Sequence, residues 1–154
     1  MADITEQEIC VFAEAVGHYF NQMTGEQAKI ETSFLAEGRT GLPAYDFTGQ
    51  ITVGGQYQGY IYFSAPRIML TRLLLEMKEL QQTDAQWLDA VGEIANTLSG
   101  NARKHFGETM EISTPMAVRG APKQFAAPVR KRPYVILFKW KNYDAAVIVD
   151  IVRN

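Results

Sequence analysis

The sequence predicts an α/β fold of the α+β type, formed by a single domain over residues 1–154. Three observations support this prediction. Apolar residues recur at helical spacing in some stretches, they alternate with polar residues in others, and 154 residues suffice for one hydrophobic core but not for two. The expected order of elements is α-β-β-α-α-β-β-β. Its helix-strand-strand pattern begins once at Thr5 and again at Thr83, which suggests two similar halves.

The first predicted helix has a signal at each end. Thr5 and Glu8 are spaced for a capping box, in which each side chain binds a backbone N–H of the other residue. Gly25 follows the last apolar residue of the pattern and is expected to end the helix. Cys10, within this helix, is expected to be a small buried residue rather than a nucleophile.

Two further helices are expected in the middle of the chain. The shorter one starts near Pro66, since proline is tolerated in the first turn of a helix. The longest helical pattern covers residues 84–106. Thr83 and Gln86 form a second possible capping box before it, and Gly107 is expected to end it.

The strands of the first half are predicted from alternation and turn residues. Residues 36–43 contain glycines and a proline and indicate a loop. Residues 45–53 alternate apolar with polar side chains, which predicts a strand with one buried face and one wet face. Gly54 and Gly55 suit a two-residue hairpin turn, and residues 56–63 then form the partner strand.

The second half is expected to contain three strands. Residues 109–118 indicate a strand, and Pro115 should place it at a sheet edge or introduce a bulge because proline donates no hydrogen bond. Residues 119–128 are expected to form a mobile loop. Residues 134–140 and 145–152 are rich in strand-forming residues and are predicted to form a terminal hairpin.

Composition and charge narrow the class of function. Hydrophobic residues make up 47% of the chain and charged residues 21%, and the formal net charge is −2, which argues against non-specific nucleic-acid binding. The first 50 residues hold eight acidic and two basic side chains, whereas residues 119–141 hold seven basic ones. This basic segment could contact an acidic partner, or it could simply be a solvated loop and an exposed strand face.

A cytoplasmic location is expected. Cys10 is the only cysteine, so no internal disulfide can form, as is usual in a reducing compartment. The first residues lack the apolar segment of a signal peptide, and no apolar run approaches the roughly 18 residues that suggest a membrane span. His18 and His105 lie far apart in the sequence without a cysteine cluster, so no protein metal site and no bound cofactor are expected.

The polar face of the longest helix carries the candidate site. Glu93 and Asn96 are three residues apart, which brings a carboxylate and a carboxamide together on one side of a helix. Gly100 lies one turn further along and would allow a partner's backbone to come close, because glycine has no side chain. The same face supplies the candidate partner-binding residues Asp89, Thr97, Gly100 and Lys104.

At these residues the chain resembles a known family. Glu-Ile-Ala-Asn, followed by Leu-Ser-Gly-Asn-Ala-Arg, is similar to the signature helix of the CheC/CheX response-regulator phosphatases. That family is marked by a Glu-x-x-Asn pair with glycine four residues after the asparagine, and Glu93, Asn96 and Gly100 occupy these places. The first helix contains no second pair of this kind, so one site per chain is expected, as in the CheX type.

The resemblance implies a mostly antiparallel central sheet with long helices packed on it. It also implies hydrolysis of the aspartyl phosphate on a response regulator such as phosphorylated CheY. Asn96 would orient the attacking water, and Glu93 would pair with the regulator's active-site lysine. The Mg²⁺ ion would belong to the regulator, so this chain would need no ligand cluster of its own.

Two other functions remain open from the sequence. The chain could be a binding module that captures a phosphorylated regulator without hydrolysing it, or a purely structural oligomerisation protein. Members of the CheX type dimerise through their β-structure, and the apolar residues of the terminal hairpin favour the same here. We therefore expect a homodimer formed through these late strands, with Val135, Leu137, Val147 and Val149 at the contact.

Overall fold

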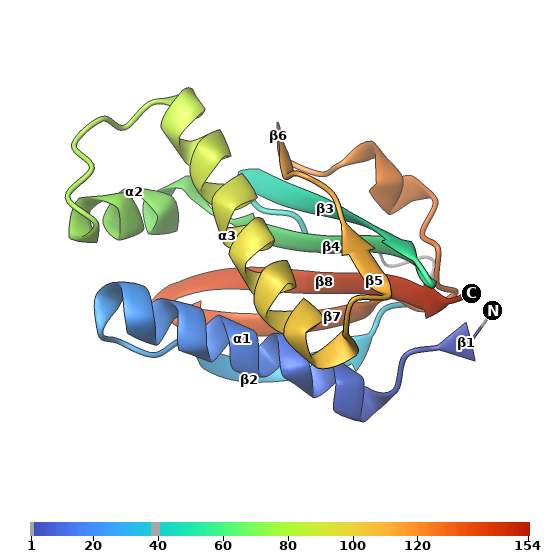
Figure 1. Ribbon diagram of the computed structural model, residues 1–154. Coiled ribbons are helices and arrows are strands. Elements are labelled where there is room, and N and C mark those ends of the chain that lie inside the picture. The colour runs from blue at the N-terminus through green and yellow to red at the C-terminus, as the bar shows by residue number, and fades with distance from the viewer. Residues whose placement is uncertain (1, 38–40) are drawn as a thin grey trace.

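A computed structural model describes residues 2–37 and 41–154. Figure 1 shows one twisted sheet with the helices α1 and α3 lying across a single face of it. Within these residues the sheet has eight strands, with the order β2-β7-β8-β4-β3-β5, and β1 and β6 pair with β8 and β3. Every pairing is antiparallel. The predicted α+β class with a mostly antiparallel sheet is confirmed.

The strands differ from the prediction at both ends of the sheet. Two strands, β1 and β2, were not expected, and the strand predicted for residues 109–118 is divided in two. The break falls around Pro115, and both pieces pair with β3 at the sheet edge, as the proline indicated. The strands are β1 (Ala2–Asp3), β2 (Lys29–Leu35), β3 (Phe47–Gly55), β4 (Tyr57–Ala65), β5 (Met110–Ile112), β6 (Met116–Arg119), β7 (Tyr134–Trp140) and β8 (Tyr143–Arg153).

The helices follow the predicted boundaries closely. They are α1 (Glu6–Thr24), α2 (Arg67–Glu76) and α3 (Asp84–Phe106). Thr5 and Glu8 form the predicted capping box, and Gly25 ends α1 in a left-handed conformation. Thr83 precedes α3, but it does not cap a backbone N–H, because its hydroxyl instead donates to the side chain of Gln86.

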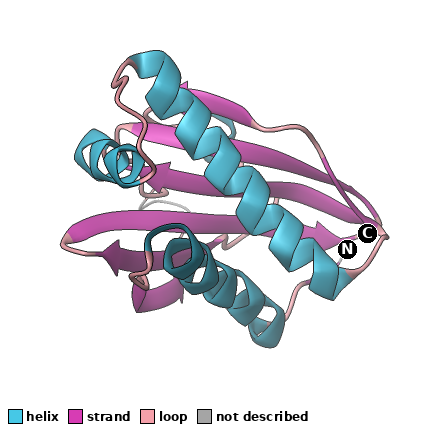
Figure 2. Ribbon diagram, turned by 60° about the vertical axis from the view of Figure 1, so that its left-hand side comes forward, coloured by secondary structure: helices cyan, strands magenta, loops and turns pink. Residues whose placement is uncertain are grey.

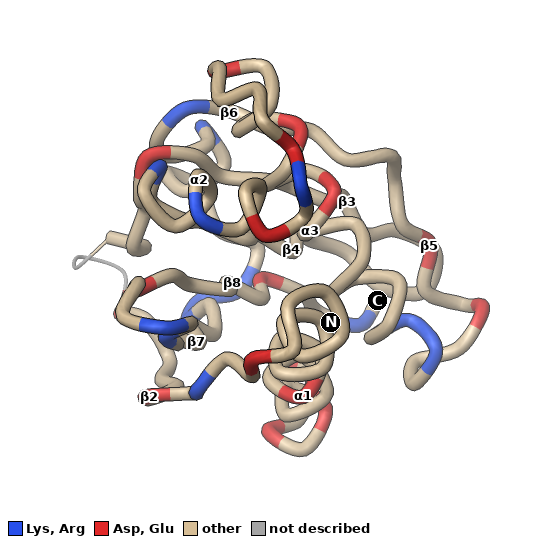
Figure 3. Tube along the Cα trace, turned by 90° about the vertical axis from the view of Figure 1, so that its left-hand side faces the viewer, with Lys and Arg blue, Asp and Glu red and all other residues tan. Residues whose placement is uncertain are grey.

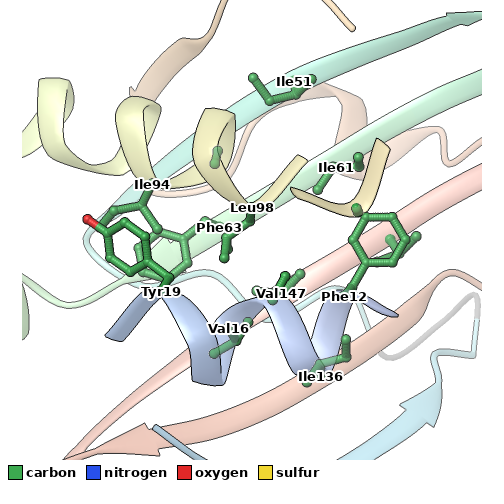
Figure 4. Packing of buried hydrophobic residues seen from close by; sticks show 14 of the residues in the cluster. Phe12, Val16, Tyr19, Ile51, Ile61, Phe63, Ile94, Leu98, Ile136 and Val147 are labelled. Carbon is green, nitrogen blue, oxygen red and sulfur yellow. The ribbon is translucent and has the colours of Figure 1, made fainter. Parts of the chain in front are cut away.

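The main hydrophobic core lies between the sheet and the helices α1 and α3. Figure 2 shows these two helices in front of the sheet, with α2 beyond one end of it. The core is built from large apolar side chains of all these elements, and Figure 4 shows Phe12 and Val16 of α1 beside Val147 and Ile136 of the sheet. Burial of this apolar surface is the principal contribution to folding free energy.

The opposite face of the sheet is covered as well, which corrects two strand predictions. Thr48 and Gln50 were expected on a wet face, but both are buried, and the Thr48 hydroxyl donates to the carbonyl of Gly120 at 2.7 Å. The loop expected to be mobile contains a short 3-10 helix (Lys123–Ala126), and its Phe125 packs on Tyr62 of β4 with a centroid separation of 4.7 Å. The sheet is therefore sandwiched between helices and a loop layer.

The predicted turn at Gly54 and Gly55 is also displaced. Both glycines belong to β3 and pair with Glu111 and Met110 of β5, and the turn lies at Gln56. Of the two glycines, only Gly55 has a positive φ, of 77°.

A separate expectation, that Cys10 is buried, is also wrong, since Cys10 is exposed on α1.

The expected dimer contact through the late strands does not fit this fold. Both β7 and β8 lie inside the sheet, each with a neighbour on either side. Val147 and Val149 are buried under the helices, and Val135 and Leu137 belong to the apolar cluster on the opposite face. The apolar character that suggested an interface is explained by burial within one chain. One edge of the sheet is instead β2, all of whose residues are exposed.

One close contact fixes the long helix on the sheet. Gly49 of β3 lies directly against the backbone of α3 at Val91 and Gly92. A Cβ atom at Gly49 would overlap the Val91 carbonyl oxygen and would come within 2.9 Å of the Gly92 backbone nitrogen. Phe47, two residues earlier on the same strand, packs on Trp87 of α3 with a ring separation of 5.7 Å. The first half of α3 is therefore held at a defined height above β3.

Replacing Gly49 by alanine should destabilise the fold markedly, because the helix backbone must move away from the strand. We expect a loss of about 3 kcal/mol in the free energy of unfolding. Gly17→Ala in α1 is the matched control, since a Cβ there meets no atom within 4 Å and should stabilise the helix by about 0.5–1 kcal/mol. Denaturant titration measures both values. Equal stability of the Gly49→Ala variant and the parent would contradict the importance of this contact.

Candidate functional site

The polar stripe of α3 faces away from the sheet, as its spacing predicted. Glu93 is exposed and Asn96 is half-buried, and neither side chain belongs to the hydrophobic core. Asp89 is exposed one turn before Glu93. Gly100 lies one turn after Asn96, and a Cβ added to it would meet no atom within 4 Å. These four residues form a continuous strip of about 16 Å along the helix axis.

Thr97 and Lys104, the other two predicted partner-binding residues, are less closely associated with the strip. The Thr97 hydroxyl donates to the carbonyl of Glu93 at 2.9 Å, so it is engaged within its own helix. Lys104 is exposed two turns beyond Asn96, about 12 Å further along the axis. It can reach only a partner that extends along the whole second half of α3.

The start of α3 is anchored by side chains from the neighbouring segments. The Trp87 indole donates to the Gln82 side chain at 3.0 Å, and the Arg67 guanidinium of α2 lies 5.0 Å from the Trp87 ring centroid. Arg119, at the end of β6, forms an ion pair with Asp84 in the first turn of α3. These contacts tie the helix to the elements on both sides of it, so the strip rests on a rigid support.

A cleft of about 270 Å³ opens on one side of the strip, where α1, α2 and α3 meet. Asp89 and Glu93 stand on its α3 wall, and an apolar lining is contributed by Leu73, Leu74, Met77 and Ile94. Tyr19 reaches into it from α1. Sequence reasoning placed Tyr19 only on an apolar helix face, because the cleft exists only after three helices have come together.

Tyr19 is nine-tenths buried, with 8% of its surface exposed. Its ring meets Phe20 edge-on at 5.2 Å, and Figure 4 shows the hydroxyl pointing past Ile94, away from the other core side chains. Burial, together with the negative charge of Glu93, raises the pKa of Tyr19 to about 12. The hydroxyl is therefore neutral at physiological pH and stands close to the carboxylate of the strip.

A second, shallower hollow of about 340 Å³ lies on the other side of the strip. It is lined by Asp89 and Glu93 again, and by Pro115, Met116 and Ala117 at the start of β6. Met116 is 62% exposed. Asp89 and Glu93 thus form an acidic ridge between two hollows, and the exposed methionine that borders the ridge is of a residue type enriched at protein-binding surfaces.

The basic segment at 119–141 does not form a single patch. Arg130 is buried, Lys139 lies within 3.5 Å of Glu31 and 3.3 Å of Asp144, and Lys141 lies 2.9 Å from Glu26. Figure 3 shows basic and acidic residues interspersed over the fold rather than separated. The interpretation of this segment as a docking patch for an acidic partner is therefore not supported, because its charges are distributed and largely paired.

Potential metal ligands are scattered over the fold. Over residues 2–37 and 41–154, no three histidine, cysteine, aspartate or glutamate side chains converge in a way that could hold a metal ion. His18 and His105 are both exposed, on different helices. Within the same ranges no helix combines the length and the apolar character needed to cross a membrane.

The fold and the strip define a class of protein: an antiparallel sheet with two long helices on one face, one of which exposes a Glu-x-x-Asn pair. The sequence profile of a family described as "Chemotaxis phosphatase CheX" matches residues 47–139, more than half of the chain. The matched region contains β3, to which α3 is fixed, and the whole of α3. The chain therefore belongs to the CheX family.

Solved structures show the same fold. The chemotaxis protein CheX from a Desulfovibrio desulfuricans subspecies is 19% identical, with a TM-score of 0.74 over 96% of this chain and 99% of that chain. A CheC-like superfamily protein from a Shewanella species is 18% identical, with a TM-score of 0.76 over 98% and 99%. A CheX from Borrelia burgdorferi, in complex with CheY, BeF3 and Mg²⁺, is 12% identical, with a TM-score of 0.75 over 95% and 98%. No curated protein matches the chain by sequence.

Proposed function

We propose that this protein is a cytoplasmic phosphatase that hydrolyses the aspartyl phosphate of a response regulator of the CheY type. The observation that carries the proposal is the placement of Glu93 and Asn96 together on the outer face of a rigidly supported α3. Membership of the CheX family supports the reaction class. The Borrelia burgdorferi complex, which has the same fold, supports a CheY-like partner.

An aspartyl phosphate is an acyl phosphate and already has a good leaving group. The catalytic requirement is therefore mainly the placement of a water molecule in line with phosphorus. An amide can do this by hydrogen bonding without a change of protonation. We assign this role to Asn96, because its side chain is half-buried, which limits its freedom, and makes no hydrogen bond with a described residue that would have to be broken.

Glu93 is assigned to docking. Its exposed carboxylate, next to Asn96, would pair with the active-site lysine of the regulator and would set the register of Asn96 on the phosphoryl group. The surface that the regulator would contact is extended by Asp89, Thr97, Gly100 and Lys104. The Mg²⁺ ion of the reaction is assigned to the regulator, and this chain contributes no metal ligand and no cofactor to the proposed reaction.

A binding module that captures the phosphorylated regulator without hydrolysis would use the same surface. The two functions are separated by turnover. Several phosphorylated response regulators of the same cell are incubated with the protein at a concentration well below theirs, and the loss of the phosphoryl label is followed. We expect complete dephosphorylation of one regulator. Loss of label equal only to the amount of protein added would favour capture.

Substitutions at the two central residues should have different effects. Asn96→Ala should reduce the single-turnover rate about 100-fold or more, because the water loses its orienting hydrogen bond, while the affinity for the regulator changes little. Glu93→Ala should reduce both affinity and rate, because it removes a charge pair formed on docking. Both variants should unfold within about 0.5 kcal/mol of the parent, since neither side chain supports the core.

Single-turnover kinetics and regulator affinity, measured for both variants, test this assignment. An Asn96→Ala protein that still accelerates hydrolysis like the parent would show that the amide is not the catalytic group. Weaker capture by Glu93→Ala would in that case still support the binding-module alternative.

Gly100→Ala gives a test in which stability and function should move in opposite directions. The added methyl group meets no atom of the chain within 4 Å and replaces a helix-interior glycine, so unfolding should cost about 0.5–1 kcal/mol more. The same methyl group should hinder the close approach of the regulator and weaken its binding. Gly17→Ala, on the neighbouring helix, is the control and should be stabilised without any loss of binding. Unchanged regulator affinity in Gly100→Ala would remove Gly100 from the interface.

A homodimer also remains a proposal, with a different contact from the one that the sequence suggested. The edge strand β2 has one unpaired side, and Ile30, Phe34 and Leu35 on it are each about 40% exposed. Antiparallel pairing of two β2 strands would cover this edge and extend the sheet. Light scattering at micromolar concentration should then give twice the mass of one chain. A monomer at that concentration, with Phe34→Lys unchanged, would contradict the proposal.

A further inference from the structure

The cleft beside Glu93 has a composition that selects its occupant. Three acidic residues line it, namely Glu79, Asp89 and Glu93, and no lysine or arginine is among the described lining residues. The rest of the lining is largely apolar and includes Leu74 and Met77. An occupant that matches both parts must carry a positive charge at one end and an aliphatic stem behind it, as lysine and arginine do.

Tyr19 is a second and independent indication of a ligand. It is nine-tenths buried, and its hydroxyl makes no hydrogen bond with any described residue. The hydroxyl oxygen itself is not among the fully buried polar atoms of the described residues, so it stays open to the cleft. The hydroxyl lines the cleft together with Glu93 and is directed away from the other core side chains (Figure 4). A group that enters the cleft would find this oxygen free to accept a hydrogen bond.

We propose that the cleft between α1, α2 and α3 binds a basic side chain of the docked response regulator, and that Tyr19 is the positioning residue that accepts a hydrogen bond from it beside Asp89 and Glu93. This inference rests on the proposed function and deepens it. It assigns part of the recognition to α1 and α2, whereas the catalytic strip lies entirely on α3. An apolar occupant fits less well, because it would desolvate the carboxylates and leave the Tyr19 hydroxyl unpaired.

The neutral state of Tyr19 suits this role. Burial and the nearby charge of Glu93 raise its pKa to about 12, so the hydroxyl neither adds charge nor repels the carboxylates at physiological pH. The basic head group would then donate hydrogen bonds both to the neutral Tyr19 hydroxyl and to the carboxylates of Asp89 and Glu93. Several acceptors restrict the position of the head group more than a single exposed carboxylate would. A fixed head group in turn restricts how Asn96 approaches the phosphoryl group.

Two substitutions test the cleft, each with a matched control. Tyr19→Phe removes only the hydroxyl, and Tyr60→Phe, on the opposite face of the sheet, is its control. Met77→Lys places a cation of this chain in the cleft, where it competes with the regulator. Met23→Lys is the control for added charge, because Met77 and Met23 are exposed to 41% and 43% and only Met77 lines the cleft. Affinity is measured for the regulator carrying BeF3⁻ and Mg²⁺, with BeF3⁻ standing in for the phosphoryl group.

We expect Tyr19→Phe to weaken regulator binding about 10- to 150-fold, the range for one hydrogen bond to a charged group. Met77→Lys should weaken it about 10-fold through repulsion at the same place. At saturating regulator the hydrolysis rate of Tyr19→Phe should stay within about 3-fold of the parent, because the hydroxyl does not touch the reacting atoms. The thermal midpoint of Tyr19→Phe should stay close to that of the parent, since the hydroxyl makes no hydrogen bond with a described residue. A merely structural role for Tyr19 would lower it.

A double-mutant cycle identifies the occupant. One arm replaces the active-site lysine of the regulator by alanine, and the other arm replaces, one at a time, the lysines and arginines around its phosphorylation site. If the removal of one side chain abolishes the effect of Tyr19→Phe on regulator affinity, that side chain is the one that enters the cleft. If Tyr19→Phe and Met77→Lys both bind like the parent while Asn96→Ala loses hydrolysis, the cleft inference is overturned and the proposed function stands. If the parent binds no regulator, both are overturned.

Discussion

The contact of Gly49 with the backbone of Val91 sets the position of α3, and with it the polar strip that carries Glu93 and Asn96. Strand β3 presents no side chain at this point, so α3 rests directly on the sheet. Helices that pack through side chains are usually separated from a sheet by a full layer of them, and such layers can adjust when one residue changes. A backbone-to-backbone contact cannot adjust in this way. The polar strip on the outer side of α3 is therefore held at a fixed height and angle.

The same contact explains why the two halves of the chain are not structurally equivalent. The segment α1-β2-β3-β4 corresponds to α3-β5/β6-β7-β8. If each strand is replaced by its counterpart, the strand order β2-β7-β8-β4-β3-β5 becomes the same order read from the opposite edge of the sheet. Strand β3, under α3, offers a glycine, whereas β7, under α1, offers Phe138 and Trp140. Phe20 of α1 packs on these two rings at 5.7 and 5.5 Å. Helix α1 thus stands on aromatic side chains, and its contribution to the candidate site comes through Tyr19 rather than through its own backbone position.

How much the sequence could predict depended on how local the determining interactions are. The bounds of α3 and the ends of α1 follow from residues within a few positions of each other, such as Thr5 with Glu8, and these predictions are confirmed. The polar strip with Glu93 followed from helical spacing alone. Strand β2 was missed because its residues are all exposed and show no alternation, so only its pairing with β7 makes it a strand. The displaced Gly54-Gly55 turn has the same origin, because β5, distant in the sequence, extends β3 beyond the glycines.

Two features of this surface differ in how far the sequence revealed them. Helical spacing already placed Gly100 on the polar strip, where a glycine in a helix interior lowers stability relative to alanine, whereas the unpartnered hydroxyl of Tyr19 was placed beside the strip only by the meeting of α1, α2 and α3. Neither is required by the packing of the chain, since Gly100 has free space around it and the Tyr19 hydroxyl binds no described residue. Both lie near the same acidic ridge. A helix glycine that costs stability without serving the packing is expected where a protein meets its partner. Their common location near Glu93 is therefore a reason, separate from the Glu-x-x-Asn spacing, to place the interface at this part of the helix surface.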